Sequence, residues 1–388
     1  MLKYHSLRDK VFNLTNLYSA FAQVKKNKGK AGLDRVSIKQ FEADLDTNIL
    51  NIHKELKTAI YKPAPVLRVY IPKGKRGKRP LGIPIVKDRV IQQAFRQIIE
   101  PIFEKEFSDN SFGFRPNRSC HDAIKKVEQY KDEGYRYILD ADIASFYDTI
   151  PHKLIVDRLR EKIADGWVLT SIENMLKAGV MEDGVYRKTE EGTPQGGVIS
   201  PLLANLVGDL IDKELEKREY KFVRYADDFI VMTKTKEELP ATLSFVKEVV
   251  EGKLGLKLSE DKTKLTNFKR GFRFLGYDFI GRYKGISNKS LDKLKENIRD
   301  ITKRTQGVNL KTVIDRLNPV IRGHVNYFRL GDVQMAYRRL DCWVRMRLRC
   351  FKFKRKCRTD NRRLPVHRFK KMGLLSFEEV FLKRCIKA

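Results

Sequence analysis

Apolar residues recur at helical spacing in several separate segments of the chain, and each such segment predicts an amphipathic helix. Segments 17–24 and 37–60 have this pattern, and so does segment 88–103, where Pro101 falls near the expected end of the helix. Beyond residue 285 the character of the sequence becomes helical. Two apolar stripes define the expected helices there: Leu294, Ile298 and Ile301 in the first, and Leu340, Trp343, Val344 and Phe351 in the second.

The middle of the chain alternates apolar runs of strand length with helical segments. The expected strands lie in VLRVYIP, YRYILDADI, FVRYADDFIVM and GFRFLGYDFI, of which the third reads as a hairpin and the fourth as a strand pair. Helices expected to begin near residues 152, 169 and 201 stand between them. This order predicts an α+β domain with a palm-like sheet.

Charge points to the class of partner. The chain has 80 Lys and Arg against 49 Asp and Glu, so its formal net charge is +31, an excess that favours a polyanion such as nucleic acid. No run approaches the roughly 18 apolar residues that span a membrane, and no apolar core of a secretory signal follows Met1. We therefore expect a cytoplasmic protein that binds nucleic acid and no membrane.

Two clusters of acidic residues adjoin apolar strands. Asp227 and Asp228 lie in YADD, which on its own is typical of a solvated hairpin turn, and Asp140 and Asp142 end the strand LDADI. Two strands of one sheet can bring such clusters together. Convergent carboxylates repel one another unless cations neutralise them, and Mg²⁺ accepts both carboxylate and phosphate oxygens. The pattern predicts phosphoryl transfer with two Mg²⁺ ions, for which Mn²⁺ is the alternative.

An ordered series of motifs resembles the reverse transcriptases of the group II intron type, the bacterial maturase family. The motifs are IPKGKRGKRPLGIP, SFGFRPNRS, DADIASFYD, GTPQGGVISPLLANL, RYADDFIVM, LKLSEDKT and FRFLGYDF, and they cover residues 71–279. A later stretch with IRGHVNYFRLGD and WVRMRLR is similar to the thumb, or maturase, region of the same family. The resemblance implies a right-hand polymerase with fingers, a palm built on an RRM-like antiparallel sheet, and a helical thumb.

The resemblance also implies domain limits. They are an N-terminal extension (1–60), fingers (61–133), a palm with finger-associated helices (134–285), a helical thumb or maturase region (286–351) and a short basic tail (352–388). The tail is shorter than the DNA-binding region usual in the family, and no endonuclease domain is expected.

The resemblance assigns the catalytic carboxylates. Asp142, Asp227 and Asp228 would be the metal ligands, joined by the backbone carbonyl of Ile143, and Lys262 would stabilise or protonate the pyrophosphate. Asp140 and Asp148 are expected to be structural instead.

Further residues are assigned by the same resemblance to the incoming dNTP. Lys73 and Arg79 would grip its triphosphate, and Tyr147 would exclude a ribose 2′-hydroxyl by its bulk, although an ordinary core tyrosine is the alternative reading. Gln195 would lie against the nascent base pair, and Gly196 would allow close approach of the nucleic acid.

Contacts to the nucleic-acid backbone are expected from Arg115 and from the cations of the thumb and tail. Those cations are Arg345, Arg349, Lys354 and Arg355, for which a solvated basic helix is the alternative. In the N-terminal extension, Gly32, Leu33 and Asp34 resemble the family's G-[IV]-D-G, but Arg35 replaces the final glycine. A left-handed turn at Arg35 is therefore not expected.

The expected function is RNA-directed DNA polymerisation, with an RNA template, a DNA or RNA primer and dNTPs as partners. A cognate structured intron RNA is a further expected partner. Two alternatives stay open: a maturase that acts mainly as an RNA-binding splicing cofactor, and a domesticated reverse transcriptase in phage defence or DNA repair.

Overall fold

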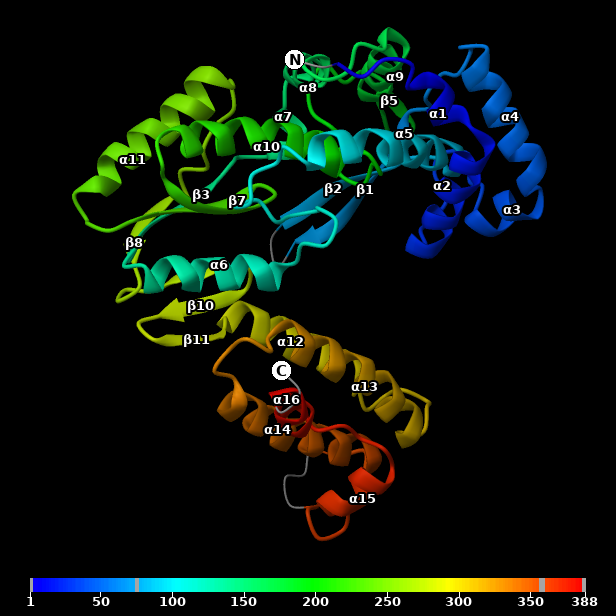
Figure 1. The fold of residues 1–388 in the computed structure, drawn as a ribbon. Coiled ribbons are helices and arrows are strands. Elements are labelled where there is room, and N and C mark those ends of the chain that lie inside the picture. The colour runs from blue at the N-terminus through cyan, green and yellow to red at the C-terminus, as the bar shows by residue number, and fades with distance from the viewer. Residues whose placement is uncertain (1–2, 74–76, 356–359, 386–388) are drawn as a thin grey trace. The chain divides into compact units, whose positions relative to one another are not determined.

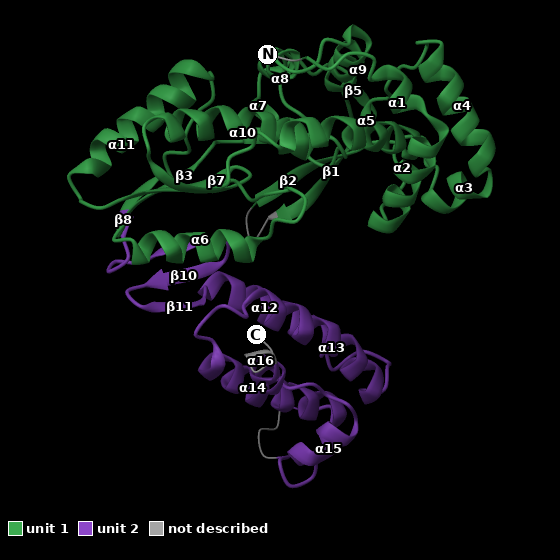
Figure 2. Ribbon diagram, in the orientation of Figure 1, with its two compact units in different colours: residues 1–265 green, residues 266–388 purple. Residues whose placement is uncertain are grey.

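The computed structural model describes residues 3–73, 77–355 and 360–385. The chain divides into two compact units, residues 1–265 and 266–388 (Figure 2). The division falls inside the segment assigned above to the palm, so the strands after residue 265 group with the C-terminal helices.

Unit 1 begins with a group of short helices followed by one long helix. They are α1 (Arg8–Phe12), α2 (Leu14–Asn27), α3 (Ile38–Ala43), α4 (Leu45–Lys57) and α5 (Val86–Glu104). The stripe predicted for α2 is buried, and α2 packs against α5 (Figure 1). The single helix expected over 37–60 is instead two helices, because the backbone leaves the helical conformation at Asp44.

A first sheet joins two hairpins that lie far apart in the sequence. Its strands are β1 (Val66–Lys73), β2 (Gly77–Ile83), β4 (Val180–Glu182) and β5 (Val185–Arg187), in the order β2-β1-β4-β5. β1 and β2 form an antiparallel hairpin, whereas β1 and β4 pair in parallel.

The second sheet holds both acidic motifs. Its strands are β3 (Tyr137–Asp142), β6 (Lys221–Tyr225), β7 (Asp228–Thr233) and β8 (Lys264–Asn267), in the order β6-β7-β3-β8. Leu139 and Ala141 on β3, with Phe229 and Val231 on β7, are buried in the main core. That core also contains helices α10 (Ser200–Lys217) and α11 (Glu238–Lys247), which lie on one side of the sheet (Figure 1). Since side chains alternate along a strand, the neighbouring positions face the other side.

Unit 1 also contains further helical elements. They are α6 (Cys120–Asp132), α7 (Phe146–Thr149), α8 (His152–Arg160), α9 (Gly166–Leu176) and a π-helical turn, η1 (Glu248–Lys253). α6 packs against the edge strand β6, and α8 packs against both α9 and α10.

In the part of unit 2 that the structure describes, there are a small antiparallel sheet and five helices. The strands are β9 (Phe272–Phe274), β10 (Tyr277–Ile280) and β11 (Tyr283–Ile286), in the order β11-β10-β9. The helices are α12 (Asn288–Ile301), α13 (Leu310–Tyr327), α14 (Gln334–Lys352), α15 (Val366–Lys371) and α16 (Phe377–Cys385). Asp341 on α14 fixes the start of α16 by accepting hydrogen bonds from the backbone N–H groups of Phe377 (2.8 Å) and Glu378 (3.1 Å).

The mixed α+β architecture predicted from the sequence is confirmed. Across the described residues, we find no helix that combines the length and the apolar composition needed to cross a bilayer.

Candidate active site

Asp142 and Asp228 lie directly opposite each other on neighbouring antiparallel strands. The β3–β7 ladder pairs them, and it also pairs Asp140 with Ile230. Asp140 and Asp142 alternate with the core residues Leu139 and Ala141, so both project from the face away from α10 and α11. Side chains paired in this way have Cβ atoms roughly 4.5 to 5.5 Å apart, so strand register alone brings the two acidic motifs together.

The carboxylates of this cluster have raised pKa values. Burial and the charges of Asp140, Asp227 and Asp142 raise the pKa of Asp228 to about 7. Burial and Asp142 likewise raise the pKa of Asp140 to about 6, and burial raises the pKa of Asp227. Partly buried like charges are costly without a cation, so this face of the sheet has the electrostatics of a cation site.

Lys262 supplies one positive charge to this cluster. Its Nζ donates to Asp142 Oδ1 at 2.6 Å. The segment that carries it is held along β3, because Ser259 N donates to the Asp142 carbonyl (2.8 Å) and Ile143 forms an isolated bridge with Leu258. The Lys262 side chain stays 56% exposed, so it remains accessible to a substrate.

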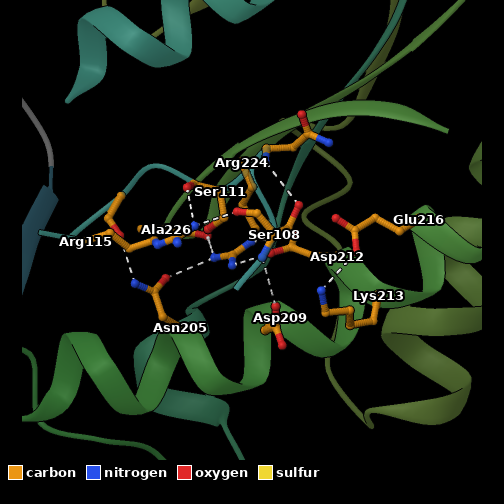
Figure 3. A network of polar contacts seen from close by, with 12 residues as sticks. Ser108, Ser111, Arg115, Asn205, Asp209, Asp212, Lys213, Glu216, Arg224 and Ala226 are labelled. Carbon is orange, nitrogen blue, oxygen red and sulfur yellow. Dashed lines mark hydrogen bonds and ion pairs between the residues drawn. The ribbon is translucent and has the colours of Figure 1, made fainter. Parts of the chain in front are cut away.

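A buried polar network holds the YADD turn, residues 225–228 (Figure 3). Arg224 donates from Nε and Nη2 to the two carboxylate oxygens of Asp212 at 2.8 and 2.6 Å. Its Nη1 donates to Asn205 Oδ1 and to the carbonyl of Ala226, each at 3.1 Å. Ala226 has a φ of +61°, a conformation that favours glycine, so the network fixes a strained turn.

Sequence reasoning missed this network, although the sequence carries a signal for it. Arg224 is a lone charge inside the apolar run FVRY, and Asn205, Asp209 and Asp212 recur at helical spacing among the apolar residues in the first part of α10. Polar residues at core positions of a strand and a helix indicate mutual pairing.

The same network corrects the prediction for Arg115. Its side chain is 2% exposed and pairs with Glu104, and Nη1 donates to the carbonyls of Ser108 (2.5 Å) and Ser111 (2.8 Å). Arg115 therefore braces the SFGFRP segment from inside, and the predicted contact with template backbone is wrong, because a guanidinium buried in this way cannot reach a phosphate.

The charges of Asp227 in the YADD turn and of Arg79 on β2 both act on the Tyr147 hydroxyl. Burial and the charge of Asp227 raise its pKa, whereas Arg79 lowers it. Its side chain packs at the margin of the main core, and Arg79 is exposed on β2. Lys73 ends β1, and its side chain lies outside the described residues.

Gln195 is held from two directions. Its Nε2 donates to Asp148 Oδ2 at 3.2 Å, and its carbonyl accepts from Gly82 N at 2.7 Å. Gly196 has a φ of +118°, and a Cβ there would lie 2.5 Å from the Gly82 carbonyl oxygen. Glycine is thus required at position 196, because only a residue without a Cβ allows the backbone of the motif GTPQGG to lie this close to the β1–β2 hairpin. Asp148 thus positions the Gln195 side chain.

In unit 2, intramolecular contacts engage the predicted nucleic-acid-binding cations. Arg349 is buried, with Nε donating to the Leu364 carbonyl (2.9 Å) and Cζ 5.4 Å from the Phe369 ring centroid, which corrects its prediction as a phosphate contact. Lys354 Nζ donates to the Arg304 carbonyl (2.7 Å), and Arg355 pairs with Asp360. Arg345 is half-buried, with a contact to Cys342 Sγ (3.3 Å).

The donor set of the acidic cluster fits hard divalent cations. The side chains offer the oxygen ligands that Mg²⁺ prefers. A bound Mg²⁺ would also offset the repulsion between the carboxylates, which contributes to the raised pKa of Asp228. In residues 3–73, 77–355 and 360–385, no group of three or more acidic, histidine or cysteine side chains is already arranged around one metal position.

Comparison with known proteins places the chain in a family. Residues 71–279 match the family model described as reverse transcriptase (RNA-dependent DNA polymerase). Residues 291–369 match the model of the group II intron, maturase-specific domain. Both matches fall on the segments that the sequence motifs indicated.

Two curated relatives support the assignment. The chain is 36% identical over 287 residues to protein YkfC of Escherichia coli (strain K12), covering 64% of this chain and 75% of that protein. It is 34% identical over 341 residues to the group II intron-encoded protein LtrA of Lactococcus lactis subsp. cremoris, covering 70% of this chain and 56% of that protein. The chain thus spans three quarters of the first relative and little more than half of the second.

A solved structure of telomerase from Candida albicans is a more distant neighbour, with a TM-score of 0.48, 15% identity, and coverage of 75% of this chain and 58% of that chain. From the two family matches and the two relatives, the chain belongs to the reverse transcriptase family, in the group II intron branch that carries a maturase-specific domain.

Proposed function

We propose that the chain adds deoxyribonucleotides to the 3′ end of a primer with RNA as the template. The observation that carries the proposal is the ladder pair Asp142–Asp228, which lies beside Asp227 on the face of the sheet opposite the core helices. Matches of this segment to the reverse transcriptase model support the same reading.

Each residue of the site has a task in this proposal. Asp142, Asp227 and Asp228, with the Ile143 carbonyl, would hold two Mg²⁺ ions, which when bound supply positive charge at the attacking hydroxyl and at the leaving pyrophosphate. Lys262, whose side chain is 56% exposed, would leave Asp142 and donate a proton to the pyrophosphate.

The nucleotide would be bound by residues around the carboxylates. Arg79, together with Lys73, would bind its phosphates, and Tyr147 would face the sugar at the position where a 2′-hydroxyl is excluded. Gln195, fixed by Asp148 and Gly82, would support the nascent base pair. The partners are then an RNA template, a DNA or RNA primer and dNTPs.

Primer extension on an RNA template tests the proposal. The wild-type chain with Mg²⁺ and dNTPs should extend the primer, and D228N should reduce the rate by roughly a thousandfold, because a metal ligand and its charge are lost. D183N is the matched control, since Asp183 is an exposed acid in another hairpin turn of unit 1 and its change also removes one charge. A D228N variant that extends primers as fast as D183N would refute the assignment of the site.

A second candidate function rests on the match of residues 291–369 to the maturase-specific domain. We propose that the chain also binds structured intron RNA and promotes its splicing. If so, D228N should still promote splicing of the cognate intron while failing to synthesise DNA, because RNA binding does not use the carboxylates. Loss of both activities in D228N would argue against a separate maturase function.

A further inference from the structure

Phe114 is the one phenylalanine that the fold leaves exposed. All 22 phenylalanines lie in the described part of the chain, and of these only Phe114 has an exposed side chain, at 51%. Its backbone is also in the left-handed region, with a φ of +58°. A bulky residue in that conformation is a rare outlier and carries a cost in folding free energy.

The flanking residues hold this turn firmly. Phe112 N donates to the Arg224 carbonyl at 2.9 Å, and the Gly113 carbonyl accepts from Asn205 Nδ2 at 2.8 Å. Both Phe112 and Arg115 are buried, and Arg115 is braced by the polar network of Figure 3. The backbone that carries the exposed ring is therefore fixed by its neighbours. Strained residues persist at functional sites when the surrounding structure holds them in this way.

The turn lies against the catalytic segment. A Cβ on Gly113 would come within 2.5 Å of Ala226 N, so the two backbones are in direct contact. The Phe114 and Tyr225 ring centroids are 6.4 Å apart. Tyr225 is half-buried and precedes Ala226 and Asp227, so the two rings form one aromatic surface next to the carboxylates.

The chemistry of the neighbourhood selects the ligand. Carboxylates repel phosphates, so a nucleic acid that approaches here must present its sugars and base edges rather than its backbone charge. Aromatic side chains pack against the apolar face of a sugar or of a terminal base pair without reading sequence. We propose, resting on the function proposed above, that Phe114, packed beside Tyr225, contacts the primer–template duplex and is a positioning residue for the primer end.

The left-handed backbone makes a sharp test available. Asn tolerates this conformation better than Phe, so F114N removes the ring and relieves the strain at once. We expect its thermal unfolding midpoint to be equal to or above that of the wild type, while its affinity for a short RNA–DNA duplex with a recessed 3′ end falls roughly fivefold to tenfold. F114W, which restores an aromatic face, should recover most of that affinity. L50Q is the matched control, because Leu50 on α4 is 52% exposed.

The salt dependence separates this contact from a phosphate contact. Because no counterion release is involved, the plot of log affinity against log salt for F114N should be displaced without a change in slope. Extension from a recessed primer end should lose kcat/KM for the duplex more than KM for dNTP. Wild-type duplex affinity in F114N would overturn the inference, and so would a parallel loss of thermal stability and affinity, which would indicate a purely structural role. If the wild type extends no primer, the proposed function fails, but the binding comparison still decides the role of Phe114.

Discussion

Arg224 and Asp212 form a two-hydrogen-bond ion pair inside unit 1, with side chains 1% and 0% exposed. Truncating one partner leaves the other charge buried and alone. R224A should therefore lower the free energy of unfolding by about 3 to 5 kcal/mol in chemical denaturation. The double variant R224M/D212L, which removes both charges, should be more stable than R224A, and the opposite order would contradict the pairing energetics.

Metal binding should depend on pH through Asp228. With a pKa of about 7, this carboxyl is mostly protonated in acid, so a divalent ion must displace a proton there. The apparent affinity for Mn²⁺, measured by electron paramagnetic resonance of the free ion, should rise about tenfold between about pH 6 and pH 8.

A substitution of the neighbouring Asp140 tests the origin of this pH dependence. Because its negative charge helps to raise the pKa of Asp228, D140N should move the midpoint of the binding curve to lower pH. D183N should leave the midpoint in place. An unchanged midpoint in D140N would mean that the charge of Asp140 does not affect the Asp228 carboxyl.

Gly113 should be indispensable for reasons of space. An Ala Cβ there would lie 2.5 Å from Ala226 N, a backbone atom that cannot yield without moving Asp227. G113A should reduce kcat for primer extension at least about tenfold, since small displacements of reacting groups are costly. G166A is the control, because nothing lies within 4 Å of a Cβ at Gly166, and its activity should be unchanged.

Tyr147 should set the preference for the sugar. Y147A should raise incorporation of ribonucleotides relative to deoxyribonucleotides by about 10- to 100-fold, because the proposed barrier to the 2′-hydroxyl is steric. Y147F keeps the ring and should keep the selectivity. Equal selectivity in Y147A and the wild type would leave Tyr147 as a core residue only.

In unit 2, two arginines of α14 should differ in their effect on RNA binding because they differ in burial. R345Q should lower the salt slope of RNA binding by about 0.7 to 0.9, the value for one lost phosphate contact. R349M should leave that slope unchanged but lower the unfolding midpoint, since Arg349 bonds the Leu364 carbonyl. A change of slope in R349M and none in R345Q would reverse the assignment.

The elements and the acidic cluster could be predicted because their signals are local. The run YRYILDADI is rich in strand-forming residues and ends in alternating apolar and acidic positions, and the order of the motifs indicates that Asp142, Asp227 and Asp228 converge. The sequence did not indicate that Phe114 is exposed and that the neighbouring Arg115 is buried. This arrangement depends on Glu104 and on the carbonyls of Ser108 and Ser111, which only the folded chain brings around the guanidinium.

Backbone conformation at single residues was equally hard to predict. Arg35 was not expected to adopt a left-handed turn, yet its φ is +61° and its N–H donates to the Gly32 carbonyl at 3.1 Å. The expectation was wrong because tertiary packing can impose a conformation that costs about 1 to 2 kcal/mol locally. At Gly32 that packing is tight, since a Cβ would lie 2.7 Å from backbone atoms of Ile85.

The pairing of Asp142 with Asp228 has a consequence for how this chain can vary in length. Because the two acids meet through strand register, inserting or deleting one residue within β3 or β7 would turn one of them toward α10 and α11 and separate the pair. A residue added to the β4–β5 hairpin at Asp183 and Gly184 would leave that register untouched. A change of length in β3 or β7 is therefore expected to abolish DNA synthesis, whereas the same change in the β4–β5 turn is expected to leave it intact.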